Sequence, residues 1–189
     1  MEPLAKLFGS ASRLKLLRLF LFNQDTAYTL DEVVARTKIA KPAARHDLAV
    51  LLAAGVVQKK AGSAVAYRAN PKFEHLAALD AFIRATTSVR TNDILAALKR
   101  AGTLKLVVLS GLFTATEESQ ADLLVVGDTL NTRALANAVR SLEAELGREI
   151  RYAAFPTPDF RYRMGVYDRL LRDIFDYSHR ILLDKIGVN

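Results

Sequence analysis

The sequence predicts a two-domain protein of the α+β or α/β class. Three patterns support this prediction. Apolar residues first recur at helical spacing and then give way to two short alternating segments. Helical spacing resumes as far as Gly102, and from Leu104 onward apolar runs of strand length alternate with helices. A chain of 189 residues, 51% of them hydrophobic, can bury two small cores. We expect an N-terminal domain at residues 1–74, a helical connector at 75–102 and a C-terminal α/β domain at 103–189.

Charge is concentrated at the start of the chain. Residues 1–75 carry twelve Lys and Arg against six Asp and Glu, a net charge of +6, while residues 76–189 carry fifteen against fourteen, a net charge of +1. A basic domain joined to a near-neutral one suits a phosphate-bearing partner. The alternative is a solvated basic surface.

Composition also excludes several classes of protein. The chain has no cysteine, which removes disulfides, thiolate metal sites and thiol nucleophiles, and a cytoplasmic location fits. Basic residues interrupt the apolar N-terminal stretch, so it falls short of the ~20 residues that span a bilayer. We therefore expect no membrane association.

Three helices are predicted in the N-terminal domain. Leucine spacing predicts the first, which starts at Ser10 or Ser12 and ends at Phe22. Thr29 and Glu32 form a capping-box pattern, so a second helix begins at Leu30 and runs to about Thr37. Pro42 suits the first position of a third helix, which Gly55 ends.

The third helix has a polar surface at its start. Ala44, Leu48, Leu51 and Leu52 share one face and predict its buried side. The expected outward residues are Lys41, Pro42, Ala43 and His46, with Arg45 at the edge of the buried stripe. Small residues permit close approach and cations reach phosphates or guanine edges, so this turn can enter the major groove of double-stranded DNA. The alternative is an ordinary third helix of a helical bundle.

A basic β-hairpin is predicted after this helix. Residues 56–60 and 64–68 alternate as two short strands around Ala61, Gly62 and Ser63. Lys59, Lys60 and Arg68 lie on or beside it, where they can contact the DNA backbone.

These features together resemble a known family. Leu48, Leu51, the Ala-Gly-Val-Val run at 54–57 and a basic hairpin ending in Tyr67 and Arg68 resemble the winged helix-turn-helix of ArsR-type and MarR-type bacterial repressors. The resemblance covers most of residues 4–70 and implies a DNA-binding transcriptional regulator. The chain has only three histidines and no cysteine, so the resemblance does not extend to metal sensing.

The predicted connector is helical. Apolar spacing from Leu76 to Ile83, and again from Ile94 to Gly102, flanks a polar stretch at residues 86–93. Such helices either pair two subunits into a homodimer, which would present two recognition helices to two half-sites, or pack against the C-terminal domain of the same chain.

The C-terminal domain is predicted to be an α/β unit. Strands are expected at residues 104–109, 122–126 and 149–155, and a helix from Asn131 or Thr132 to Leu146. A short helix opens at Thr157, and a closing helix runs over residues 167–185. Asp128 is expected beyond its strand, as a turn or helix-start residue.

This order of elements resembles the small nucleotidyltransferase fold, including the minimal nucleotidyltransferases of toxin–antitoxin pairs, over residues 103–165. In active members a Gly-Ser pair holds phosphate, and two carboxylates at i and i+2 bind two metal ions with help from a third. Here Gly111 matches the glycine and Leu112 replaces the serine. Asp122 matches the second carboxylate and Gln120 replaces the first. Arg151 lies near the position of the third.

A lone Asp122 beside a neutral Gln120 cannot hold two divalent ions. We therefore predict no metal, no cofactor and no enzyme activity: the domain is a degenerate nucleotidyltransferase, or pseudoenzyme, that serves for effector binding or dimerisation. Gly111, Asp122 and Arg151, with Arg161 nearby, would bind a nucleotide or other small-molecule effector. Two alternatives stay open, an active nucleotidyltransferase and an antitoxin-like partner protein.

Overall fold

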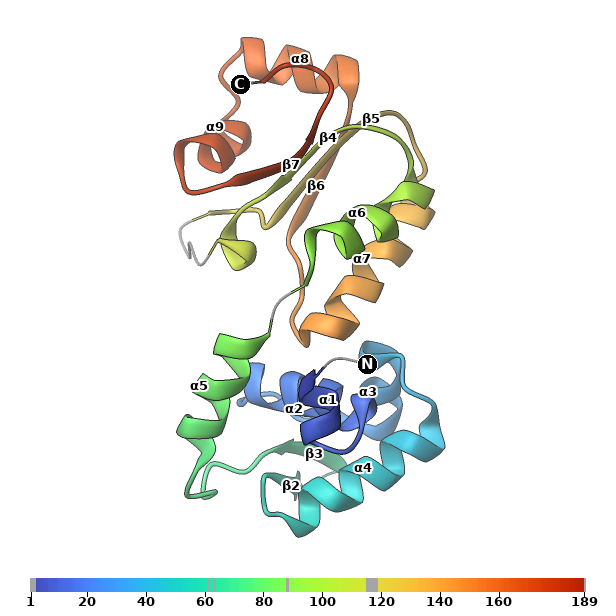
Figure 1. Cartoon of the computed structure of the whole chain (residues 1–189), viewed down its shortest axis with the longest axis vertical. Coiled ribbons are helices and arrows are strands. Elements are labelled where there is room, and N and C mark those ends of the chain that lie inside the picture. Colours follow the sequence, from blue (N-terminus) through green and yellow to red (C-terminus); the bar gives the residue numbers. More distant parts are fainter. Residues whose placement is uncertain (1–2, 61, 63, 88, 115–118, 189) are drawn as a thin grey trace. The chain divides into compact units, whose positions relative to one another are not determined.

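The protein combines helices with two β-sheets and belongs to the mixed α+β class (Figure 1). The computed structural model describes residues 3–60, 62, 64–87, 89–114 and 119–188. Ala61 and Ser63 of the expected hairpin turn, and residues 115–118 of the expected polar loop, lie outside this range. Within it, no helix is both long and apolar enough to cross a membrane.

The chain divides into two compact units. Unit 1 comprises Met1–Val89 together with Arg140–Glu149, and unit 2 comprises Arg90–Val139 together with Ile150–Asn189. The elements of unit 1 before residue 90 are α1 (Pro3–Leu7), α2 (Ala11–Phe22), β1 (Tyr28–Thr29), α3 (Leu30–Thr37), α4 (Lys41–Ala53), β2 (Val57–Lys60), β3 (Ala66–Ala69) and α5 (Leu76–Thr86).

Local chemistry sets the helix starts in unit 1. The Ser10 hydroxyl accepts from the Arg13 amide and begins α2, as the leucine spacing predicts. The capping box of α3 is confirmed: the Thr29 hydroxyl accepts from the Glu32 amide, and the Glu32 carboxylate accepts from the Thr29 amide. Lys38 then adopts the left-handed conformation that ends α3.

The core of unit 1 lies between its helices and a small antiparallel sheet. The strands have the order β1-β3-β2. Leu17, Phe20 and Leu21 of α2 pack with Leu48 and Leu51 of α4 and are almost fully buried. Burial of these large side chains fixes which face of α4 points outward.

Unit 2 is built on a four-stranded sheet with the order β6-β5-β4-β7. Its strands are β4 (Gly102–Leu109), β5 (Leu123–Leu130), β6 (Tyr152–Pro156) and β7 (Arg180–Asp184). Its helices are α6 (Thr91–Leu98), a 3₁₀ turn η1 (Lys99–Ala101), a 3₁₀ turn η2 (Gly111–Phe113), α8 (Thr157–Gly165) and α9 (Arg169–Asp176). The helix α7 (Thr132–Leu146) starts in unit 2, and its last residues belong to unit 1. β5 and β6 are parallel, and the other pairs are antiparallel.

The predicted closing helix over residues 167–185 is wrong. α9 ends at Asp176, and residues 180–184 form β7, which pairs with β4. Without β7, β4 would be an unpaired sheet edge. Ile181 also packs onto the apolar cluster that Phe160 of α8 and Ile174 of α9 form on one sheet face.

Three further expectations are corrected by the extent of the strands. Asp128 lies within β5, which continues to Leu130, and is not a turn or helix-start residue. Asp122 directly precedes β5, and β6 begins only at Tyr152.

Candidate nucleic-acid interface

The start of α4 presents a polar surface to solvent. Lys41, Pro42, Arg45 and His46 are exposed. Lys41 with Arg45, and Pro42 with His46, are four residues apart and so are neighbours on one helix surface. Ala43, expected to face outward, is half-buried and packs against the core, because it lies four residues before the buried Asp47 on the same side of the helix.

The cations of α4 differ in what they contact. Lys41 Nζ lies 2.5 Å from Asp31 Oδ1, and both side chains stay largely exposed. The hydrogen bond and charge of Lys41, with a contribution from Arg45, lower the pKa of the Asp31 carboxyl. Among the described residues Arg45 forms no ion pair. Arg45 is therefore the α4 cation most available to an external anion.

The N-termini of α3 and α4 offer opposite surroundings to an anion. The first turn of α3 carries Asp31 and Glu32, and the capping box satisfies the Glu32 amide and the Thr29 amide. α4 follows Ala40, has no side-chain cap within the described structure and has no acidic residue in its first turn. Uncapped amides and the positive end of the helix dipole favour a negative group at α4.

The β2–β3 hairpin adds two more cations. Lys59 and Lys60 end β2 and are exposed, and they lie opposite Tyr67 and Ala66 of β3. Arg68 is half-buried and lies opposite Gln58. α4 packs against α2 and α3 and is followed directly by β2, so the helix and the hairpin belong to one packed unit (Figure 1).

A buried ion pair holds α4 in place, and sequence reasoning missed it. Asp47 is 2% exposed and accepts hydrogen bonds from Arg13 Nη2 at 2.9 Å, Arg13 Nε at 3.2 Å and Ser10 Oγ at 2.9 Å. These bonds tie the middle of α4 to the start of α2. A charged residue on a leucine-rich helix face was the available signal, because such residues are rarely buried unless paired.

In unit 2 the structure brings Asp122 and Arg151 together. Asp122 Oδ1 accepts from Arg151 Nη2 and the Leu112 amide, both at 2.8 Å. Asp122 Oδ2 accepts from the Arg151 amide at 2.8 Å and Arg151 Nε at 3.1 Å. A carboxylate has about four lone-pair sites, so these four bonds leave none for a metal ion.

This pairing keeps the carboxylate ionised. Burial raises the pKa of Asp122, but hydrogen bonds from the Arg151 side chain and from the Leu112 and Arg151 amides outweigh burial and lower the pKa overall. Only glycine fits at position 111, next to this carboxylate. Gly111 has a φ of +48°, and a Cβ there would lie 2.3 Å from Asp122 Oδ1.

Gln120, which replaces the first carboxylate, and Arg161, expected near the ligand site, do not join the contact between Asp122 and Arg151. Gln120 is exposed, and its backbone N–H donates to Asp173 Oδ2 at 2.6 Å. Arg161 lines a pocket that includes neither Gly111 nor Arg151. In the described part of the chain, His, Asp and Glu form no group of three or more that could hold a metal ion.

Comparison with family models, curated proteins and solved structures found no match to this chain.

Proposed function

We propose that the protein binds double-stranded DNA through a winged helix-turn-helix formed by α3, α4 and the β2–β3 hairpin, and that it regulates transcription. The observation that carries the proposal is the exposed start of α4, where Arg45 and His46 face solvent beside an uncapped helix end. In such motifs the start of the second helix enters the major groove, and a hairpin contacts the flanking backbone.

Charge and packing support this proposal. Arg45, Lys59 and Lys60 make no ion pair among the described residues, whereas Arg13, Arg36 and Arg84 of unit 1 are paired with carboxylates. These three unpaired cations lie on α4 and the hairpin. Lys6, Lys72 and Arg148 of unit 1 also form no ion pair among the described residues, so the position of the charge and not its number supports the proposal. The buried Asp47–Arg13 contact would hold α4 rigidly enough to read base edges.

We further propose that unit 2 has no metal-dependent transferase activity and serves as a binding or dimerisation module. The saturated hydrogen bonding of Asp122 supports this proposal, because a metal ion would have to displace Arg151. Incubation with labelled nucleoside triphosphates and magnesium tests it. Label transfer by the wild-type protein would contradict it.

Selection from a random duplex library tests the DNA-binding proposal directly. The protein should enrich a short motif, and two copies of that motif about one helical turn apart would indicate a homodimer. The Arg45→Ala, His46→Ala double variant should lose the motif. Recovery of unselected sequences by the wild-type protein would overturn sequence-specific binding.

A further inference from the structure

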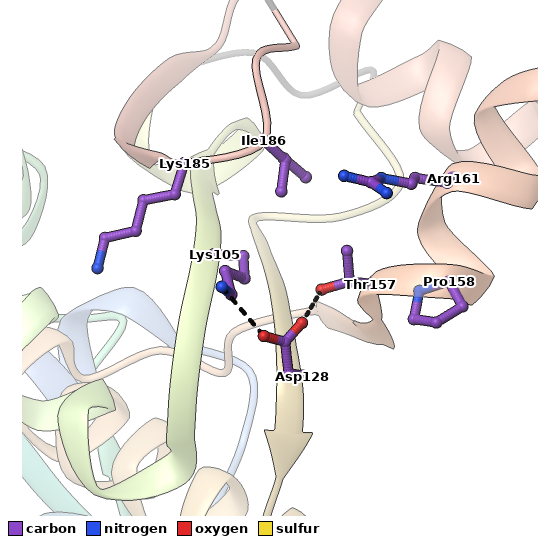
Figure 2. A pocket seen from close by; sticks show the side chains of 7 residues that line it. All are labelled: Lys105, Asp128, Thr157, Pro158, Arg161, Lys185 and Ile186. Carbon is purple, nitrogen blue, oxygen red and sulfur yellow. Dashed lines mark hydrogen bonds and ion pairs between the residues drawn. The ribbon is translucent and has the colours of Figure 1, made fainter.

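A pocket of about 550 Å³ lies beside the sheet of unit 2 (Figure 2). It is lined by Lys105, Asp128, Thr157, Pro158, Arg161, Lys185 and Ile186. Asp128 lies six residues beyond Asp122, which is about 20 Å along an extended strand. The pocket is therefore separate from the Asp122–Arg151 contact, and its volume is in the usual range for small-molecule sites.

The sheet order places polar residues of the pocket side by side. Thr157 follows β6, Asp128 lies on β5, Lys105 lies on β4, and Lys185 follows β7, in the order of the four strands. Asp128 Oδ1 accepts from the Thr157 hydroxyl at 2.7 Å, and Lys105 Nζ lies 3.1 Å from Asp128 Oδ2. Thr157, which directly follows β6, and Lys105 of β4 therefore contact the Asp128 carboxylate from opposite sides of β5.

Irregular strand pairing occurs where Lys105 meets Asp128. Leu104 pairs with Gly127 and Leu106 with Val126, so β4 has one additional residue there, Lys105. Gly102 pairs with Leu130, so β5 has one additional residue between Gly127 and Leu130. Such bulges redirect side chains and are frequent beside binding sites.

The pocket combines anion-binding groups with an acceptor for hydroxyl groups. Figure 2 shows the Arg161 guanidinium directed toward the space above Asp128, while Lys185 extends outward from the rim. Neither Arg161 nor Lys185 forms an ion pair within the described residues. The Thr157 hydrogen bond and Lys105 lower the pKa of Asp128, so its carboxylate is ionised at neutral pH and can accept further hydrogen bonds.

We propose that this pocket binds a small phosphorylated molecule that also carries hydroxyl groups. Arg161, with Lys105 and Lys185, contacts the phosphate, because a guanidinium matches phosphate geometry with two parallel donors. Asp128 accepts from a hydroxyl of the same molecule, and Pro158 and Ile186 provide apolar walls. This site does not depend on DNA binding by α4, since it lies wholly within unit 2.

Titration of the full chain with ribose 5-phosphate, followed by its amide chemical shifts, tests this proposal. Inorganic phosphate and ribose, the two parts of this probe, are titrated separately for comparison. Ribose 5-phosphate should shift amides near Asp128, Thr157 and Arg161 and bind at least tenfold more tightly than either part. Arg161→Ala should weaken that binding at least tenfold. Arg133→Ala removes an equally charged, exposed side chain outside the pocket and should leave binding within twofold.

Three outcomes would overturn the proposal. They are no binding of ribose 5-phosphate, shifts spread evenly over exposed basic residues, and equal loss of binding in both arginine variants. A parallel titration with duplex DNA shows whether the pocket binds a free phosphorylated molecule or a nucleic acid. If the duplex shifts the same pocket amides, the site contacts a DNA backbone instead. Failure here leaves the α4 proposal intact, because that proposal is tested by duplex selection.

Discussion

Two charged regions of this protein differ in what their charges contact. At the start of α4 and on the β2–β3 hairpin, Arg45, Lys59 and Lys60 are exposed and form no ion pair among the described residues. In unit 2, Arg151 and Asp122 satisfy each other through two side-chain bonds, with two backbone amides completing the carboxylate. The first arrangement leaves charge available to a partner, whereas the second uses charge to hold the fold.

The largest expected effect tests the structural role of Asp122. Asp122→Ala leaves the Leu112 and Arg151 amides without their acceptor, so we expect the free energy of unfolding to fall by about 3 kcal/mol. Asp176→Ala is the matched control, because Asp176 is exposed and lies 3.7 Å from Arg172 on the same helix. Urea denaturation measures both. Equal small losses would mean that Asp122 is not a structural residue.

The second prediction concerns recognition by α4. Removing Arg45 and His46 together should reduce discrimination between a selected duplex and a scrambled one by about 2 kcal/mol, because contacts to base edges are lost. The unfolding free energy should stay close to the wild-type value, since both side chains are exposed. Competition binding measures the discrimination. If discrimination between the two duplexes is unchanged, Arg45 and His46 are not the residues that recognise the DNA sequence.

The third prediction separates helix stability from anion binding at Ala40. Ser or Asp at this N-cap position should each raise the unfolding free energy by about 1 kcal/mol, because either can cap α4. Only Ala40→Asp should weaken duplex binding, since it places a negative charge where phosphate is expected. Thermal unfolding and fluorescence anisotropy measure the two effects. Equal affinities for the two variants would contradict a phosphate at this helix end.

The smallest expected effect is a pH dependence. The pKa of Asp122 is lowered below its ordinary value of 3.8 in the folded protein. The contribution of the ionised Asp122 carboxylate to the free energy of unfolding is therefore fully present above pH 3.8, and it is lost as pH falls through the folded-state pKa. The stability difference between wild type and Asp122→Asn should shrink from about pH 7 to about pH 3. A difference that is constant with pH would mean that ionisation of Asp122 does not contribute.

Local patterns in the sequence predicted the elements that are set locally. The capping box of Thr29 and Glu32 and the leucine spacing of α2 located helix starts correctly. The hairpin was also predicted, because its two strands are close in sequence and their alternating pattern can be seen without any long-range contact. Such signals depend on neighbours a few residues away and can therefore be seen in one sequence.

Features that depend on distant partners could not be predicted. The apolar run at residues 181–183 suits a helix or a strand, and only pairing with β4 decides for β7. Arg151 was expected near the position of the third carboxylate, but no pattern indicated that it binds both oxygens of Asp122. The pocket near Asp128 depends on the order of four strands and two register shifts, which are properties of the assembled sheet.

The salt dependence of duplex binding tests the central claim most directly. Affinity for a selected duplex should fall steeply and linearly on logarithmic axes between about 50 and 200 mM salt, because phosphate contacts release counterions. Lys59→Ala and Lys60→Ala should together lower the slope by about 2, at roughly 1 per lost phosphate contact. A salt-independent affinity, or a slope unchanged by both substitutions, would contradict DNA binding through α4 and its hairpin.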